Sequence, residues 1–304
     1  MSCAHHSSAI SSSPAKARSV SVAPGIELEV LEWGSAGEPV MLLAGFGHSA
    51  HVFEDFAPTL AEQFHVFALT RRGFGLSSVP ESGYDLSTLS ADVVHALDAL
   101  GLNHVTLIGH SAGGDEVSFI AAEYPARVTR AVYLDAAYDR TDPAMQPEAL
   151  GECFNVAPPS EADIATVEAF GAWFNRTRGT RVPTSELHSM FEHHGPAEGA
   201  FETYAKSLVR PRYEKIAAAA LAIYAVPESA ADFYPTWATM TKAERAKAVA
   251  CFESGAEQPA SRASRAEFRA RVAHGETVEL LHASHYLFIE NRARVLAEII
   301  RFLK

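Results

Sequence analysis

The feature that most constrains the fold of this chain is a strand, a tight turn and a helix around Ser111. Residues 105–108 form an apolar run with β-branched side chains, Gly109 and Gly113 flank Ser111 at two positions on either side, and residues 116–124 favour a helix. Glycines at these positions let the strand and helix pack closely and let the serine adopt a strained backbone conformation. The pattern therefore predicts a nucleophile elbow, with a serine exposed at the end of a parallel strand.

Strands and helices alternate on both sides of this elbow. The run 40–44 is apolar throughout, which is typical of a strand buried on both faces of a mostly parallel sheet. Together these segments predict a doubly wound α/β sheet. Besides the elbow, the expected strands are 19–22, 26–33, 40–44, 65–69, 128–136, 219–226 and 278–281. The expected helices are 52–63, 86–100, 241–272 with a break at 254–259, and 292–303.

The alternation of strands and helices stops between residues 137 and 212. This segment contains several prolines and helical stretches rich in Phe and Ala. We expect residues 137–212 to form an inserted helical cap, with 19–136 and 213–304 forming the core. Residues 1–18, rich in Ser, Ala and His, are expected to be a flexible tail.

Net charge and the length of apolar runs limit the kinds of molecule that this chain is expected to bind. The 304 residues carry a formal net charge of -12, which argues against nucleic acid or an anionic membrane surface. No apolar run reaches the roughly 18 residues that span a bilayer. We therefore expect a small-molecule substrate, with no nucleic-acid or membrane partner. The N-terminal stretch lacks the apolar segment of a secretory signal, so the cytoplasm is the default location, with a processed secreted form as the alternative.

The three cysteines, Cys3, Cys153 and Cys251, include no C-x-x-C pair, so no structural zinc site is expected. Unpaired thiols are the favoured interpretation, and a Cys153–Cys251 disulfide is the alternative.

Four landmarks then resemble the α/β-hydrolase fold superfamily, over about residues 19–304. They are the loop Gly45-Phe46-Gly47, the turn Arg72-Gly73-Phe74-Gly75-Leu76-Ser77, the elbow at Ser111, and the loop His285-Tyr286-x-Phe288. The resemblance is to serine-nucleophile, esterase-like members with a helical cap. It implies an eight-stranded sheet and a catalytic triad in the chain order serine, acid, histidine.

The resemblance assigns the nucleophile to Ser111 and the general base to His285. A serine hydroxyl needs a base to take its proton, and His285 lies in the loop after the last expected strand, where the family places its histidine. His282 is the alternative base. It lies three residues earlier, on or near the strand.

The acid of the triad has two candidates. Asp135 ends the strand directly after the elbow helix, a position at which haloalkane dehalogenases and lactone hydrolases carry the acid. A carboxylate at the end of an apolar strand is costly unless it is paired, and the imidazole of His285 would supply that pairing. Glu228, in the turn after the next strand, is the alternative. Asp135 is favoured.

The family also implies an oxyanion hole made by the backbone N–H groups of Phe46 and Ala112. Many relatives have His-Gly at the start of the first loop, whereas this chain has Ala44-Gly45. The backbone donor survives this change, but a hydrogen bond from the histidine that steadies the loop does not.

Several further residues are candidates for substrate contact. His48, beside the oxyanion loop, and His110, inside the elbow, could line the pocket, although structural roles are favoured for both. Trp173 and Phe174 in the cap could line an apolar pocket or pack the cap onto the core.

Two arginines, Arg71 and Arg72, precede Gly73. Arg72 matches the arginine of a common family turn, whose usual aspartate is replaced here by Thr70. A structural arginine that pins a loop is favoured over substrate binding.

These residues predict a serine hydrolase that cleaves a carboxylic ester or lactone of a small, fairly hydrophobic substrate through an acyl-enzyme, without metal or cofactor. A dehalogenase or epoxide hydrolase is disfavoured because those enzymes use an aspartate where this chain has Ser111. The alternatives are a C–C bond hydrolase, amidase or acyltransferase on the same triad, or a non-catalytic ligand-binding homologue.

Overall fold

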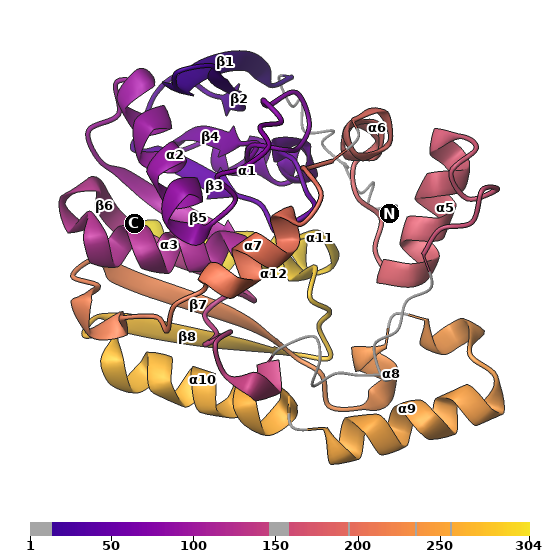
Figure 1. Cartoon of the computed structure of the whole chain (residues 1–304). Helices are drawn as coiled ribbons and strands as arrows, with labels where there is room; N and C mark the ends of the chain where they lie inside the picture. The colour runs from indigo at the N-terminus through magenta and orange to yellow at the C-terminus, as the bar shows by residue number, and fades with distance from the viewer. Residues whose placement is uncertain (1–13, 146–157, 194, 235, 256) are drawn as a thin grey trace, which may run out of the picture.

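The computed structural model describes residues 14–145, 158–193, 195–234, 236–255 and 257–304. Within them, eight strands form one sheet in the order β1-β2-β4-β3-β5-β6-β7-β8 (Figure 1). β2 pairs antiparallel with β1 and β4, and the remaining neighbours are parallel. This confirms the predicted doubly wound, mostly parallel sheet. The strands are β1 Lys16–Ala23, β2 Ile26–Trp33, β3 Pro39–Leu43, β4 His65–Leu69, β5 Val105–His110, β6 Val128–Leu134, β7 Ala219–Val226 and β8 Gly275–Leu281.

Helices cover both faces of the sheet, because alternate residues of each buried strand point to opposite faces. Met41 of β3 packs with α2 and α3 in one hydrophobic cluster, whereas its neighbour Leu42 packs with α1 and α12 in the other. The helices are α1 Ala57–Leu60, α2 Leu86–Ala99, α3 Ala112–Glu123, α5 Val167–Arg178, α6 Thr184–Glu192, α7 Ala200–Ser207, α8 Ala230–Phe233, α9 Lys242–Ser254, α10 Glu257–Arg271, α11 Leu287–Glu290 and α12 Arg292–Leu303. Short 3-10 turns are η1 Ala50–Phe53, η2 Pro125–Arg127, η3 Pro143–Met145, η5 Tyr213–Lys215 and η6 Trp237–Thr239.

Where the structure describes it, the segment between β6 and β7 consists of helices joined by turns and loops, with no strand. It contains α5, α6 and α7, and Figure 1 shows α5 and α6 standing away from the helices that flank the sheet. These three helices lie inside the range expected for the cap. None of the helices in the described ranges is both long enough and apolar enough to cross a membrane.

Several predicted boundaries differ from the structure. β6 ends at Leu134 rather than at residue 136, and β8 begins at Gly275 rather than at residue 278. The tail was expected to reach residue 18, but β1 begins at Lys16 and pairs there with Glu32. This part of β1 is an exposed edge, so it has no apolar pattern to reveal it. The helix expected over 52–63 is instead η1 followed by the single turn α1. Pro58 has no N–H to donate to the carbonyl of Glu54, which prevents one continuous helix.

The cysteines also differ from the favoured interpretation. Cys251 of α9 is disulfide-bonded, so it is not an unpaired thiol. Cys3 and Cys153 lie outside the described residues.

Candidate active site

Ser111 lies on a strained turn between β5 and α3. Its backbone has φ 51° and ψ -121°, and α3 begins at the next residue, Ala112. A Cβ atom on Gly109 would lie 2.4 Å from the carbonyl oxygen of Gly113, and one on Gly113 would lie 2.3 Å from that of Leu43. Both glycines are therefore required for α3 to pack against β5 and β3. The predicted elbow is present, and it holds Ser111 at the end of its strand.

Asp135 follows β6 and binds the histidine that the sequence favoured. Its Oδ2 atom accepts a hydrogen bond from Nδ1 of His285 at 2.7 Å. Its Oδ1 atom accepts two more, from the hydroxyl of Tyr138 at 2.5 Å and from the amide of Ala225 at 3.0 Å. The carboxylate is buried but has three donors, which offsets the cost of removing it from water. Burial, with a further contribution from the charge of Asp135, raises the pKa of Tyr138 well above its usual value, so this hydroxyl remains a donor.

The hydrogen bond to Asp135 also determines whether Nε2 of His285 acts as a donor or as an acceptor. Because Nδ1 donates to the carboxylate, Nε2 of the neutral ring is the acceptor that can take a proton. Within the described residues, no hydrogen bond joins Ser111 to His285. Hydrogen bonds of this kind are often long before substrate binds.

The alternative acid and the alternative base lie together, apart from this pair. Nε2 of His282 is 3.0 Å from Glu228, and Nδ1 is 2.9 Å from Asp232. The hydrogen bond to Asp232 raises the pKa of His282, as the nearby charges do. Its side chain is 63% exposed, so this group resembles a surface ion pair rather than a catalytic site.

The expected oxyanion donors border the nucleophile. A Cβ atom on Gly45 would lie 3.1 Å from Cβ of Ser111, so the loop that carries Phe46 runs directly beside the serine. Among the described residues, no hydrogen bond occupies the backbone N–H of Phe46 or that of Ala112. Both amides are therefore free to bind a negatively charged oxygen.

His48 connects this loop to the cap and does not present a free ring nitrogen. Its Nδ1 atom lies 2.7 Å from Glu186 of α6, and its Nε2 atom lies 3.0 Å from the hydroxyl of Tyr286. The buried carboxylate of Glu186 also accepts from the amide of Ser49 at 3.2 Å and from its hydroxyl. Burial, with a contribution from Glu186, raises the pKa of Tyr286 to about 12, so Tyr286 donates to His48. The structure favours the structural role for His48.

His110 supports the histidine loop. Its Nε2 atom lies 3.1 Å from the carbonyl oxygen of His285, and the two rings lie 4.6 Å apart. Burial lowers the pKa of His110 well below its usual value, and His285 and His48 lower it further. The neutral ring therefore donates through Nε2. The structure again favours a structural role.

The two cap aromatics pack within the cap and against the core. The Phe174 ring, 3% exposed, lies 5.9 Å from that of His48, and Trp173 stacks on Phe170 at 5.6 Å. Neither Trp173 nor Phe174 lines the cavity described in the next paragraph. Their packing matches the alternative in which they join the cap to the core.

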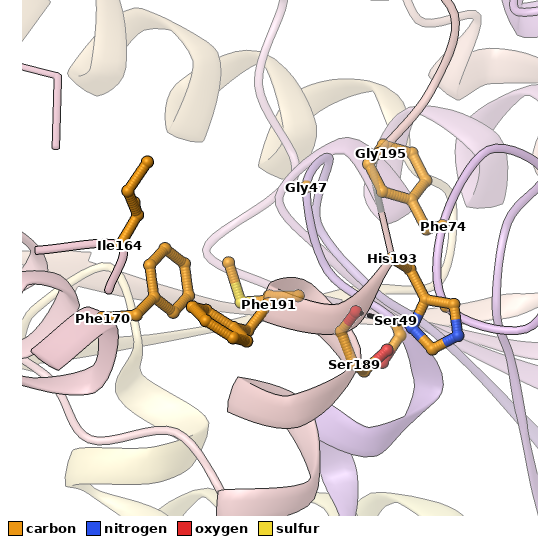
Figure 2. A pocket seen from close by; sticks show the side chains of 11 residues that line it. Gly47, Ser49, Phe74, Ile164, Phe170, Ser189, Phe191, His193 and Gly195 are labelled. Atoms are coloured by element: carbon orange, nitrogen blue, oxygen red, sulfur yellow. Dashed lines mark hydrogen bonds between the residues drawn. The ribbon is translucent and has the colours of Figure 1, made fainter. Parts of the chain in front are cut away.

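A cavity of about 430 Å³ lies between the cap and the loops that follow β3 and β4. Figure 2 shows Ile164, Phe170 and Phe191 on one side of it, and Ser189 and His193 near Ser49 on the other. Its remaining lining residues are Gly47, Phe74, Gly75, Met190 and Gly195. The cavity is therefore largely apolar. Gly47 of the oxyanion loop borders it, whereas Ser111 and His285 are not among its lining residues.

Arg72 has the structural role that the sequence favoured. It donates to both carboxylate oxygens of Asp92 in α2, each at 2.6 Å, and both side chains are buried. Such a paired, two-point contact pins the turn after β4 to α2.

In the described part of the chain, no cluster of His, Cys, Asp or Glu side chains has the arrangement of a metal site.

Sequence reasoning missed two side chains that complete this site. Tyr138 lies three residues after Asp135, but no sequence signal distinguishes it from another buried tyrosine. Glu186 lies in a helix 138 residues away from its partner His48. Only the folding of the cap over the core brings these two together.

Comparison with known proteins identifies the family. The family model of the alpha/beta hydrolase fold matches residues 38–205. A 2-(acetamidomethylene)succinate hydrolase of Mesorhizobium japonicum is 30% identical over 184 residues, which are 60% of this chain and 63% of that protein. The chain thus spans less than two thirds of the length of the curated relatives it matches first.

Solved structures share the fold over nearly the whole chain. The crystal structure of E-2-(acetamidomethylene)succinate hydrolase superposes with a TM-score of 0.65 and 22% identity, covering 95% of this chain and 99% of that one. A bromoperoxidase from Bacillus anthracis gives a TM-score of 0.67 at 22% identity, with the same coverage of 95% and 99%. Because the family model spans more than half of its residues, the chain belongs to the α/β-hydrolase family.

Proposed function

We propose that this protein is a serine hydrolase that cleaves a carboxylic ester or lactone of a small, fairly hydrophobic substrate through an acyl-enzyme. The observation that carries the proposal is the 2.7 Å contact between Asp135 and His285, beside a serine on a strained turn. A buried carboxylate that holds a partly exposed imidazole in one tautomer is the arrangement that activates a serine hydroxyl.

In the proposed mechanism, Nε2 of His285 takes the proton of Ser111 as the hydroxyl oxygen attacks the substrate carbonyl. The negative charge that develops on the carbonyl oxygen is bound by the amides of Phe46 and Ala112. His285 then gives its proton to the leaving alcohol, and the acyl-enzyme forms. Water, deprotonated by the same histidine, releases the acid and restores Ser111.

The cavity supports a hydrophobic substrate group. Phe170, Phe191 and Ile164 supply apolar walls, and Gly47, one residue after Phe46, also lines the cavity. The net charge of -12 supports a small neutral molecule rather than nucleic acid as the partner.

An amide is the second candidate substrate, because one of the most similar relatives is named as a hydrolase of an acetamido compound. The same triad chemistry cleaves amides when the leaving nitrogen is protonated by the histidine.

A substrate panel tests the proposal. We expect p-nitrophenyl esters or aryl lactones to be hydrolysed by the wild-type protein and not by Ser111→Ala. Turnover of anilides alone would move the assignment to an amidase. Absence of turnover on all three classes by a folded wild-type protein would contradict the proposal.

A further inference from the structure

Arg71 makes contacts unlike those of its neighbour Arg72. It lies at the end of β4, is 6% exposed, and donates to both oxygens of Glu116 on α3, at 3.0 Å and 2.7 Å. Its guanidinium also donates to the carbonyl oxygens of Ala44 at 3.0 Å and Gly45 at 3.4 Å. The same side chain therefore grips the elbow helix and the oxyanion loop.

The contact with Gly45 sets the direction of one particular amide. The carbonyl of Gly45 and the N–H of Phe46 belong to the same peptide unit, and in a trans peptide they point in opposite directions. The carbonyl also accepts from the amide of His48 at 3.2 Å. With its oxygen held on one side by two donors, this peptide must present the Phe46 N–H on the other.

Glu116 links Arg71 to the second oxyanion donor, the amide of Ala112. It lies on α3, whose first residue is Ala112, one position after the nucleophile. A rigid helix transmits the position of Glu116 to the amide of Ala112. The Arg71 guanidinium also lies 5.9 Å from the centre of the Phe46 ring. One buried ion pair thus spans the two elements that carry the two amides.

We propose that the Arg71–Glu116 ion pair is the positioning element of the oxyanion hole, replacing the steadying contact that a loop histidine would make at Ala44. It fixes the orientation of the Phe46 N–H and its separation from the Ala112 N–H. This inference rests on the proposed serine mechanism. Arg71 touches no reacting atom and acts through the loop.

The chain supplies a matched control. The Arg72–Asp92 pair is equally buried and makes the same two-point contact, but among the described residues its other hydrogen bond goes to the carbonyl of Ser82 rather than to the oxyanion loop. The double variants Arg71→Met/Glu116→Gln and Arg72→Met/Asp92→Asn remove both charges of each pair, so neither leaves an unpaired buried charge.

The test compares kcat, KM and inhibition by a trifluoromethyl ketone, whose adduct with serine carries an oxyanion. We expect the Arg71/Glu116 double variant to lose about 10²-fold in kcat, the cost of losing one oxyanion donor, with KM little changed. Its affinity for the trifluoromethyl ketone should fall by a similar factor. The Arg72/Asp92 double variant should lower the melting temperature comparably and keep kcat and inhibitor affinity near wild type.

Equal kcat and inhibitor affinity in the two double variants would overturn the inference. Arg71→Lys provides the same comparison against Arg72→Lys if the double variants do not fold, because lysine keeps the charge but loses the forked contact. A folded wild-type protein that neither turns over esters nor binds the trifluoromethyl ketone would instead reject the serine mechanism itself, and the inference with it.

Discussion

Asp135 shows how a single residue can combine backbone strain with full pairing of its side chain. Its φ of 49° lies in the left-handed region that non-glycine residues seldom adopt. The strain is tolerated because three hydrogen bonds, from His285, Tyr138 and Ala225, hold the carboxylate in one position. Strained residues held in this way concentrate at functional sites.

Changing Asp135 to asparagine should separate the two candidate acids. We expect Asp135→Asn to lower kcat by about 10⁴-fold with the fold intact, because the amide stabilises the wrong tautomer of His285. Glu228→Gln should remain near wild type, since Glu228 contacts His282 instead. Steady-state kinetics of the two variants show which carboxylate is the acid of the triad. An active Asp135→Asn beside an inactive Glu228→Gln would reverse the assignment.

The sequence predicts that Ser111, Asp135 and His285 lie near one another, but it does not reveal the side chains that support them. Ser111, Asp135 and His285 each follow a recognisable strand, and the ends of parallel strands meet at one edge of the sheet. Tyr138 and Glu186 were not foreseen, because their partners are set by side-chain direction and by the docking of the cap.

Among the elements, η1 is one of the places where the core meets the cap. His51 of η1 lies 3.2 Å from Glu29 of β2 and 2.6 Å from Glu54, which in turn accepts from Ser185 of α6 at 2.5 Å. Burial lowers the pKa of His51, but hydrogen bonds to the two carboxylates outweigh it and raise the pKa to about 10. The charged ring therefore joins β2, η1 and α6 near neutral pH.

The stabilisation by His51 should depend on pH with a definite sign. A histidine whose pKa is raised on folding stabilises fully below its unfolded value of about 6.5, and this contribution is lost as the pH rises towards 10. We expect His51→Gln to lower the free energy of unfolding by about 1.5–3 kcal/mol near pH 6, with the difference shrinking towards pH 10.

Urea unfolding at pH 6, 8 and 10 measures this difference. His95→Gln, at an exposed position of α2, corrects for the substitution itself. A deficit in His51→Gln that stays constant from pH 6 to pH 10 would contradict the proposed ionic role.

The elements themselves were largely predictable, and the exceptions have physical causes. Strand 219–226 and helix 292–303 coincide with β7 and α12, because both have strong hydrophobic patterns. The break between α9 and α10 was also foreseen. The helix expected at 52–63 is divided because its apolar spacing continues across Pro58, which cannot donate the backbone hydrogen bond that would join η1 to α1.

For the whole molecule, the cap and the core together line the cavity that we propose for the substrate. The cavity takes Gly47 and Phe74 from the core and Phe170 and Phe191 from the cap segment. Sequence patterns predict a helical cap in which Trp173, Phe174 and Phe191 either line an apolar pocket or pack the cap onto the core; of these three, Phe191 lines the cavity. Phe170 lies on α5, one turn before Trp173 and Phe174, whereas Phe191 lies on α6, so which cap aromatics line the cavity depends on how these helices dock.

Truncating a cavity wall should change the preference for substrate length. We expect Phe191→Ala to lower kcat/KM for a p-nitrophenyl octanoate about tenfold while changing the acetate little, because a long chain loses apolar contact that a short one never makes. Phe233→Ala, in a separate hydrophobic cluster with α9, is the matched control. Equal losses on both esters would place the acyl chain elsewhere.

We propose that Ser111 is a nucleophile activated by His285 and Asp135. Intact-mass spectrometry after treatment with a fluorophosphonate tests it most directly, because the probe reacts covalently only with an activated hydroxyl. We expect one adduct on wild-type protein, at Ser111, none on Ser111→Ala, and much slower labelling of Asp135→Asn. A folded wild-type protein that takes up no adduct, or a Ser111→Ala variant labelled as fast as wild type, would contradict it.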